Sequence, residues 1–220
     1  MITLGIIGVV AAITLPTLIQ NYRRHVVANK LKTTVSILGQ ALQRSVADNG
    51  SPDNWDFDKD TFGVYFKPYL RILKEGTVRY DVKHYGGSED GQGQASLAHP
   101  YMKTYKLSNG AIITFTKDKT LYRRGAFEIF LKEKKDGYFI YGKDIFSFSF
   151  ILGTDDGKYY ISSTSDYRPS HGFICRQSHE YLKEICVNGS GGRGYNWGIG
   201  CSALIECNGW EFPKDYPIKL

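Results

Sequence analysis

The first nineteen residues of the chain, MITLGIIGVVAAITLPTLI, contain no charged side chain. At a rise of about 1.5 Å per residue, a helix of this length is roughly 28 Å long, which is close to the hydrocarbon thickness of a bilayer. Buried helices of soluble domains are usually shorter than this run. We therefore predict that residues 1–20 form the transmembrane half of a long N-terminal helix.

The helical pattern continues beyond the apolar run and becomes amphipathic. After the basic group Arg23-Arg24-His25, apolar residues recur at steps of three and four, which places one apolar stripe along a helix. The segment Asp48-Asn49-Gly50-Ser51-Pro52 contains the residues that commonly end a helix. We predict an amphipathic half over residues 21–49. Its expected contacts with the rest of the protein are Leu31, Val35, Leu38 and Leu42.

The run ITLGIIGVVAAITLPTLIQNYRR resembles the N-terminal helix of type IV pilins and of the pseudopilins of type II secretion. Pro16 stands where that family has a helix-kinking proline, and Gly5 and Gly8 lie among the small residues of the segment. In the family, a short basic leader ending in Gly, then Phe-Thr-Leu and a Glu, precede this run. The resemblance, which covers roughly the first 45 residues, implies that a leader, a cleavage site and that Glu lie upstream of Met1.

The resemblance also implies a function, a location and partners. The chain would be a structural subunit, resident in the bacterial inner membrane through one pass, with its globular domain in the periplasm or on an extracellular filament. The segment that carries Gly5, Gly8, Val9 and Pro16 would lie in the lipid bilayer before assembly and in the filament core afterwards. Implied partners are other pilin or pseudopilin subunits, an inner-membrane assembly platform and the prepilin peptidase that processes the N-terminus before its methylation.

Other interpretations of the N-terminal run remain open. A cleaved secretory signal has a basic region before its apolar core, which Met1 to Leu4 lacks. A simple signal anchor carrying an unrelated domain is a second alternative. The loop-charge rule alone would place Arg23 and Arg24, and the domain with them, in the cytoplasm. The family resemblance implies the opposite orientation.

Residues 50–220 carry almost all of the twelve Phe, sixteen Tyr and three Trp, and their length suits one globular domain. Phe62 to Leu73 follows helical spacing, but Pro68 predicts two short helical pieces or a kink.

Asn109-Gly110 lies between two strand-like runs and predicts a hairpin. Further strands are expected at 126–132, 144–152 and 158–162, and a loop at 86–94. We predict an α+β fold similar to that of pilins, with the long helix packed on four or five antiparallel strands.

Four cysteines, Cys175, Cys186, Cys201 and Cys207, lie in the last fifth of the chain. An even number of clustered cysteines behind a membrane helix indicates two disulfides formed in an oxidising compartment. We favour the nested pairing of 186 with 201 and of 175 with 207, and the other two pairings stay open. His171, Cys175, His179 and Cys186 also have spacing that suits a zinc site, which is the alternative to disulfides.

The remaining motifs do not predict chemistry. Gly189 to Gly194 matches G-x-G-x-x-G, but no helical pattern follows it, as a dinucleotide site requires. Calcium is a minor alternative at Asp136, Asp144, Asp155 and Asp156. We expect no catalytic, cofactor or metal residues, and so no enzyme; a membrane-anchored exported hydrolase is the weaker alternative. The net charge of +6 is scattered, so nucleic-acid binding is not expected, although a minor tip subunit that binds DNA or a host surface stays a second alternative.

Overall fold

The computed structural model describes residues 2–78, 81–83, 95–96, 102–117, 123–133, 138–152, 159–163, 175, 178–188 and 199–220. Within these ranges, the side chains of 2–11, 81–83, 95–96, 123–124, 138, 152 and 188 are outside the description. The fold is α+β: a long N-terminal helix, an antiparallel sheet and a pair of disulfides near the C-terminus.

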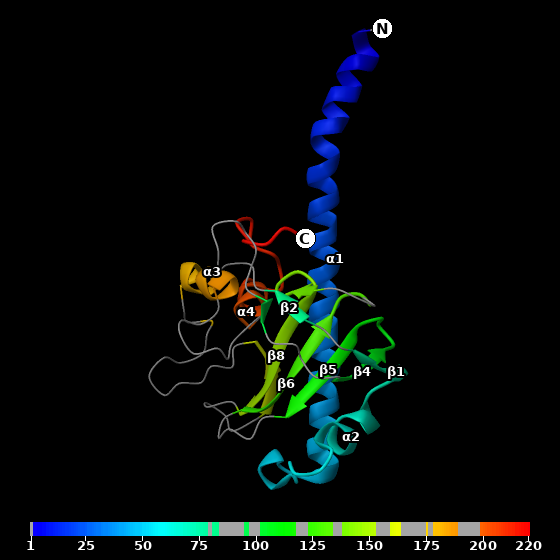
Figure 1. Cartoon of the computed structure of the whole chain (residues 1–220), viewed down its shortest axis with the longest axis vertical. Helices are drawn as coiled ribbons and strands as arrows, with labels where there is room; N and C mark the ends of the chain where they lie inside the picture. Colours follow the sequence, from blue (N-terminus) through cyan, green and yellow to red (C-terminus); the bar gives the residue numbers. More distant parts are fainter. Residues whose placement is uncertain are drawn as a thin grey trace.

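The dominant element is a single helix, α1 (Ile2–Asn49), which extends well beyond the globular body at its N-terminal end (Figure 1). It ends where the sequence predicts an end: Gly50 adopts a φ of +76°, and its amide donates to the carbonyl of Val46 at 2.9 Å. Glycine takes this left-handed conformation without the steric cost that a Cβ imposes.

The stripe predicted on the amphipathic half of α1 is buried. Leu31, Leu38 and Leu42 are completely inaccessible to solvent, and Val35 is 7% exposed. These side chains belong to the same core cluster as the aromatic residues of the sheet. Small residues of the same helix are buried as well, so the buried stripe is wider than the large apolar residues alone predicted. These small residues are Ala28, Thr34, Ala41 and Ser45.

Two short helical pieces follow α1 and η1 (Pro52–Asn54): α2 (Thr61–Tyr65) and η2 (Lys67–Tyr69). The Asp60 carboxylate caps α2 by accepting the Gly63 amide at 3.0 Å, and Pro68 lies in the second piece. The break at Pro68 agrees with the sequence, but the extension of helix to Leu73 was wrong. Strand β1 (Ile72–Val78) begins there, because its backbone pairs with β4 (Met102–Leu107).

The main sheet has six antiparallel strands in the order β1-β4-β5-β6-β8-β9. Gly110, with a φ of +77°, turns β4 into β5, as the Asn-Gly pair predicts. The sheet has more strands than the four or five expected, since β1 is an added edge strand. The bounds of the strands not yet given are β5 (Ile112–Lys117), β6 (Arg123–Phe130), β8 (Ile145–Leu152) and β9 (Tyr159–Ser162).

Both faces of the sheet are covered. Phe146, Phe148 and Phe150 of β8 face the core shared with α1. Ser147 and Ser149, on the opposite face, are buried too, beside a second apolar cluster that includes Phe130 and Tyr141. A small second sheet, in the order β3-β2-β7, supplies part of this cluster through Phe139. Its strands are β2 (Asp81–Lys83), β3 (Ala95–Ser96) and β7 (Tyr138–Ile140).

The C-terminal part contains helices α3 (His179–Asn188) and α4 (Ile199–Cys207) and a tail that reaches residue 220. Disulfides join Cys186 to Cys201 and Cys175 to Cys207, which is the favoured nested pairing. The first bridge links α3 to α4, and it leaves neither cysteine as a thiolate for zinc. The expected loop at 86–94 and the glycine-rich segment Gly189 to Gly194 lie outside the described residues.

Candidate functional site

The part of α1 that precedes Arg23 stands away from the body, and we call it the projecting segment (Figure 1). Its described side chains include large apolar residues that are exposed to solvent. Ile13 is 70% exposed and Leu18 is 64% exposed. Exposure of this extent is unusual for contiguous apolar residues of a soluble surface, and it marks a surface that another apolar phase or partner covers. Other exposed large residues of the same segment are Leu15, Ile19 and Tyr22, and Val26 is exposed just after it.

The residues predicted to contact the membrane or filament core all lie in this segment. Pro16 is in the interior of α1, where its ring removes one backbone donor from the helical ladder. Gly5, Gly8 and Val9 belong to the same helix, but their side chains are outside the described part. Within the residues that the structure describes, no helix is both long and apolar enough to cross a membrane.

At the foot of the projecting segment, Arg24 ties α1 to the C-terminal tail. Its Nη1 donates to the carbonyl of Pro213 at 3.3 Å and to that of Lys214 at 3.5 Å. Next to this contact the Tyr216 hydroxyl donates to the Gly142 carbonyl at 2.8 Å. Burial raises the pKa of Tyr216 far above its ordinary value, and the nearby Arg24 charge opposes that rise only in part. The tail is thus fixed beside the helix through its backbone.

A charged cluster fixes α3 to the same tail. The Lys183 ammonium donates to Asp215 Oδ2 at 2.8 Å, and His179 Nε2 lies 2.9 Å from Asp215 Oδ1. The hydrogen bond from Lys183 has the larger effect on the Asp215 carboxyl, and together with that of His179 it lowers the pKa to about 2. Asp215 is therefore ionised at neutral pH, where the Lys183 ammonium offsets its charge.

Polar bonds position the lower half of α1 on the sheet. Asn109 Nδ2 of the β4–β5 turn donates to Thr34 Oγ1 at 2.9 Å, and Lys30 Nζ donates to the Leu131 carbonyl at 3.0 Å. Burial lowers the pKa of Lys30, and the charge of Lys106 adds to the effect. These bonds fix the rotation of α1 about its axis, so the direction in which the projecting side chains point is also fixed.

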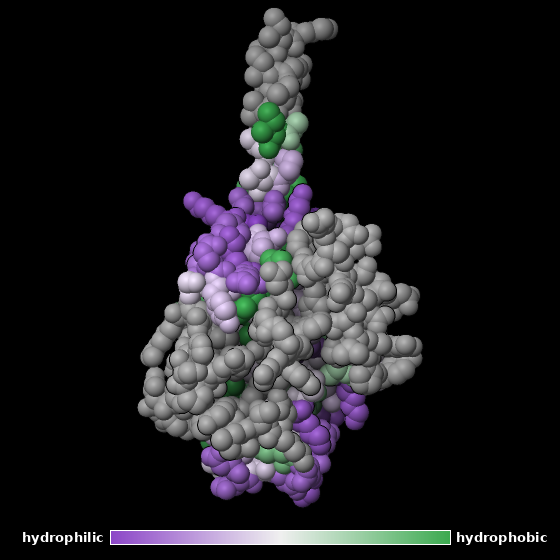
Figure 2. All heavy atoms as spheres, turned by 60° about the vertical axis from the view of Figure 1, so that its left-hand side comes forward, coloured by the Kyte–Doolittle hydropathy of each residue, from purple (hydrophilic) through white to green (hydrophobic). Residues whose placement is uncertain are grey.

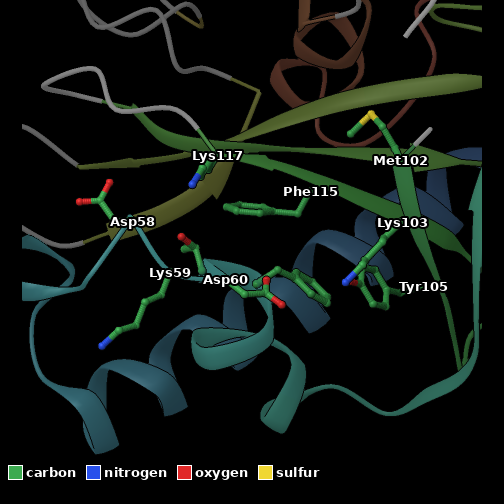
Figure 3. Close-up of a pocket in the computed structure, with 10 residues that line it drawn as sticks. Asp58, Lys59, Asp60, Met102, Lys103, Tyr105, Phe115 and Lys117 are labelled. Atoms are coloured by element: carbon green, nitrogen blue, oxygen red, sulfur yellow. The ribbon is translucent and has the colours of Figure 1, made fainter. Parts of the chain in front are cut away.

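A pocket of about 440 Å³ opens between residues 58–62 and strands β4 and β5. Figure 3 shows Phe115 and Lys117 facing residues 58–60 across it. Its wall is aromatic, with the rings of Phe62 and Tyr105 stacked at 4.1 Å. The charged groups at its rim bond to close neighbours: Lys117 Nζ donates to the Phe57 carbonyl at 3.4 Å, and Asp60 caps α2. The described side chains form no nucleophile–base pair in this pocket.

The candidate metal ligands do not converge in the described part of the chain. Asp144 is 3% exposed; its carboxylate accepts the Ile140 amide at 3.1 Å and pairs with Lys132 at 3.3 Å, so it closes a turn. Among the described residues no group of three or more potential ligands comes together. Asp136, Asp155, Asp156 and His171 lie outside the described side chains.

The long helix, the six-stranded sheet and the disulfide-linked tail define an α+β protein whose most distinctive surface is a projecting apolar helix. The chain belongs to the family described as "Family of unknown function (DUF6613)", whose model matches residues 17–220. The match covers the whole globular body and the lower part of α1. No curated protein and no solved structure matches the chain.

Proposed function

We propose that the protein is a structural subunit of a filament of the type IV pilus or type II secretion pseudopilus class, assembled from the inner membrane through α1. The observation that carries the proposal is the projecting, uncharged part of α1 with its exposed apolar side chains. Lipid and the core of a helical bundle are similarly apolar, so transfer of such a helix between them costs little free energy.

The architecture of the body supports the same proposal. The lower half of α1 is a packed element of the globular core, while the upper half is free for contact with neighbours. One rigid helix therefore connects the assembly surface to the exposed domain. The disulfide-linked C-terminal part suits a domain that works in an oxidising compartment, such as the periplasm. In this proposal the fold is pilin-like, and the partners are other pilin or pseudopilin subunits, the assembly platform, the prepilin peptidase and the lipid bilayer.

The test is cross-linking between subunits in cells that express the full gene, including any upstream leader. A photo-reactive amino acid at Leu18 should give a ladder of cross-linked oligomers in the membrane fraction, because this side chain is 64% exposed on the projecting segment. Combining it with Leu15→Asp should abolish the ladder, since a charge in the helix core of a filament or in lipid is unfavourable. The matched control is Arg44→Asp, on an exposed position of the lower half of α1. A chain that stays monomeric with the Leu18 probe contradicts the proposal.

A further inference from the structure

We propose that three cations at the foot of the projecting segment bind the headgroups of anionic phospholipids. The three are Arg23, Arg24 and Lys214, and we call them the basic collar. This inference rests on the proposed function, in which the projecting segment is held in a bilayer before assembly. It adds a lipid class as partner and a surface of the body that recognises it.

Contacts between distant parts of the chain create the collar. The bonds from Arg24 to the carbonyls of Pro213 and Lys214 bring the tail to the level of α1 at which Arg23 lies. Lys183 of α3 pairs with Asp215 of the same tail at 2.8 Å, so its charge is used to offset that acid. Arg23 and Lys214 are exposed, so their charges face solvent. Figure 2 shows hydrophilic side chains gathered where α1 leaves the body, below the apolar projecting segment.

The acid within the collar does not cancel its charge. The Asp215 carboxylate pairs with the Lys183 ammonium at 2.8 Å, so these two charges offset each other and neither counts toward the collar. Glu180 lies 3.6 Å from Lys183 and is one further acid, which the three cations of the collar outnumber. Arg23, Arg24 and Lys214 therefore carry a net positive potential at this end of the molecule.

The position of the collar along α1 matches a membrane interface. Residues 2–22 contain no charged side chain, and at about 1.5 Å per residue they span roughly 31 Å, close to a hydrocarbon core. Tyr22, which is 69% exposed, then lies at the boundary, where tyrosine is enriched. Arg23 follows directly at the depth of the lipid phosphates, and Arg24 holds Lys214 beside it. Cations near an anionic leaflet are attracted to it, and the effect of each is additive to a first approximation.

Partitioning of the full-length chain into vesicles tests the inference. The chain, kept in detergent, is diluted into vesicles of phosphatidylcholine alone or mixed with phosphatidylglycerol, and the bound fraction is measured by flotation. We expect stronger partitioning into the anionic vesicles, with the difference lost at high salt. Arg23→Gln/Lys214→Gln should reduce that difference roughly 25-fold, or about fivefold per cation, and leave partitioning into neutral vesicles unchanged.

The matched control is Lys59→Gln/Lys74→Gln, which removes two exposed cations outside the collar, one just before α2 and one in β1. Melting curves by circular dichroism should be the same for both double variants, since none of these side chains is buried. Equal partitioning of the wild type into both vesicles, or an equal loss in the control, overturns the collar alone. A chain that floats with neither vesicle overturns the membrane-resident helix of the proposed function, and the collar with it.

Discussion

Gly142 is a residue at which a single added carbon atom would strain both the backbone and the packing around it. It adopts a φ of +77°, and a Cβ there would lie 2.6 Å from Cys201 Sγ, 2.7 Å from Ile218 Cδ1 and 2.8 Å from the Tyr216 hydroxyl. All three side chains are held in place, because Cys201 is in a disulfide, Tyr216 is hydrogen-bonded and Ile218 is completely buried.

We predict that Gly142→Ala lowers the free energy of unfolding by about 1–3 kcal/mol more than Gly110→Ala. Gly110 has the same φ of +77° but no atom within 4 Å of its Cβ position. Its variant therefore measures the backbone cost alone, about 1 kcal/mol. Urea unfolding followed by circular dichroism gives both values. Equal losses in the two variants would show that the tail does not pack on Gly142 as described.

Glu206 gives the body a predictable dependence on pH. Its carboxylate accepts the Ser163 amide at 2.7 Å and the Ser162 hydroxyl at 3.0 Å. Burial nevertheless raises its pKa, and these bonds offset only part of the rise. Because the pKa is higher in the folded than in the unfolded chain, this group favours folding most below its unfolded pKa. That contribution is lost as the pH rises through the folded pKa.

The corresponding variant is Glu206→Gln, which keeps an acceptor oxygen and removes the charge. Its free energy of unfolding relative to wild type should be highest near neutral pH and should fall as the solution is acidified. Chemical unfolding at a series of pH values measures this difference. Glu184→Gln, at an exposed position of α3, controls for loss of a negative charge from the same region. A relative stability of Glu206→Gln that does not change with pH would contradict the prediction.

Among the elements, α1 has two parts with different roles in folding. Val35 is 7% exposed and lies in the core, whereas its neighbour Ser36 is exposed. We predict that Val35→Asp destabilises the fold by several kcal/mol, because it places a charge in the apolar contact between helix and sheet. Ser36→Asp should change stability by no more than about 0.5 kcal/mol. Thermal melts of the full chain in detergent distinguish the two, and similar melts would mean that α1 does not pack on the sheet.

Local patterns were enough to predict those elements that are determined by residues close together in the sequence. The end of α1 follows from Gly50, and the β4–β5 hairpin from Asn109-Gly110. Strand β1 could not be predicted in this way. Its five central residues are exposed, so it lacks the alternation of a half-buried strand, and only pairing with β4 makes it a strand. The apolar Ile72 and Leu73 then looked like the end of the preceding helix.

In the candidate site, too, local patterns identified some residues and missed others. The apolar residues of the projecting segment are contiguous in sequence, so the sequence alone identified them. The contact between Arg24 and the tail joins residues 189 positions apart, and no local pattern encodes it. Arg24 was visible only as one of three adjacent basic residues. The collar that it forms with Arg23 and Lys214 depends on the fold, since α1 and the C-terminal tail are far apart in the sequence.

For the whole molecule, we predict that the body folds without the projecting segment. The side chains at residues 12–19 are exposed, so removing residues 1–20 takes away little of the buried surface. The shortened chain should be monomeric in solution and should melt within a few degrees of the full chain in detergent. Size-exclusion chromatography and circular dichroism test this. A shortened chain without cooperative melting would show that residues 1–20 belong to the folding unit.

The packing of α1 on the sheet has a mechanical consequence. From Ala28 to Leu42 its buried side chains form one stripe along the helix axis. A tensile force on the projecting end is parallel to this stripe, so it loads every packed turn in shear at the same moment. A sideways force would instead separate the turns one after another. Both disulfides lie between Cys175 and Cys207, outside the contact that bears this load. The molecule should thus resist being pulled along α1 much better than being levered away from it.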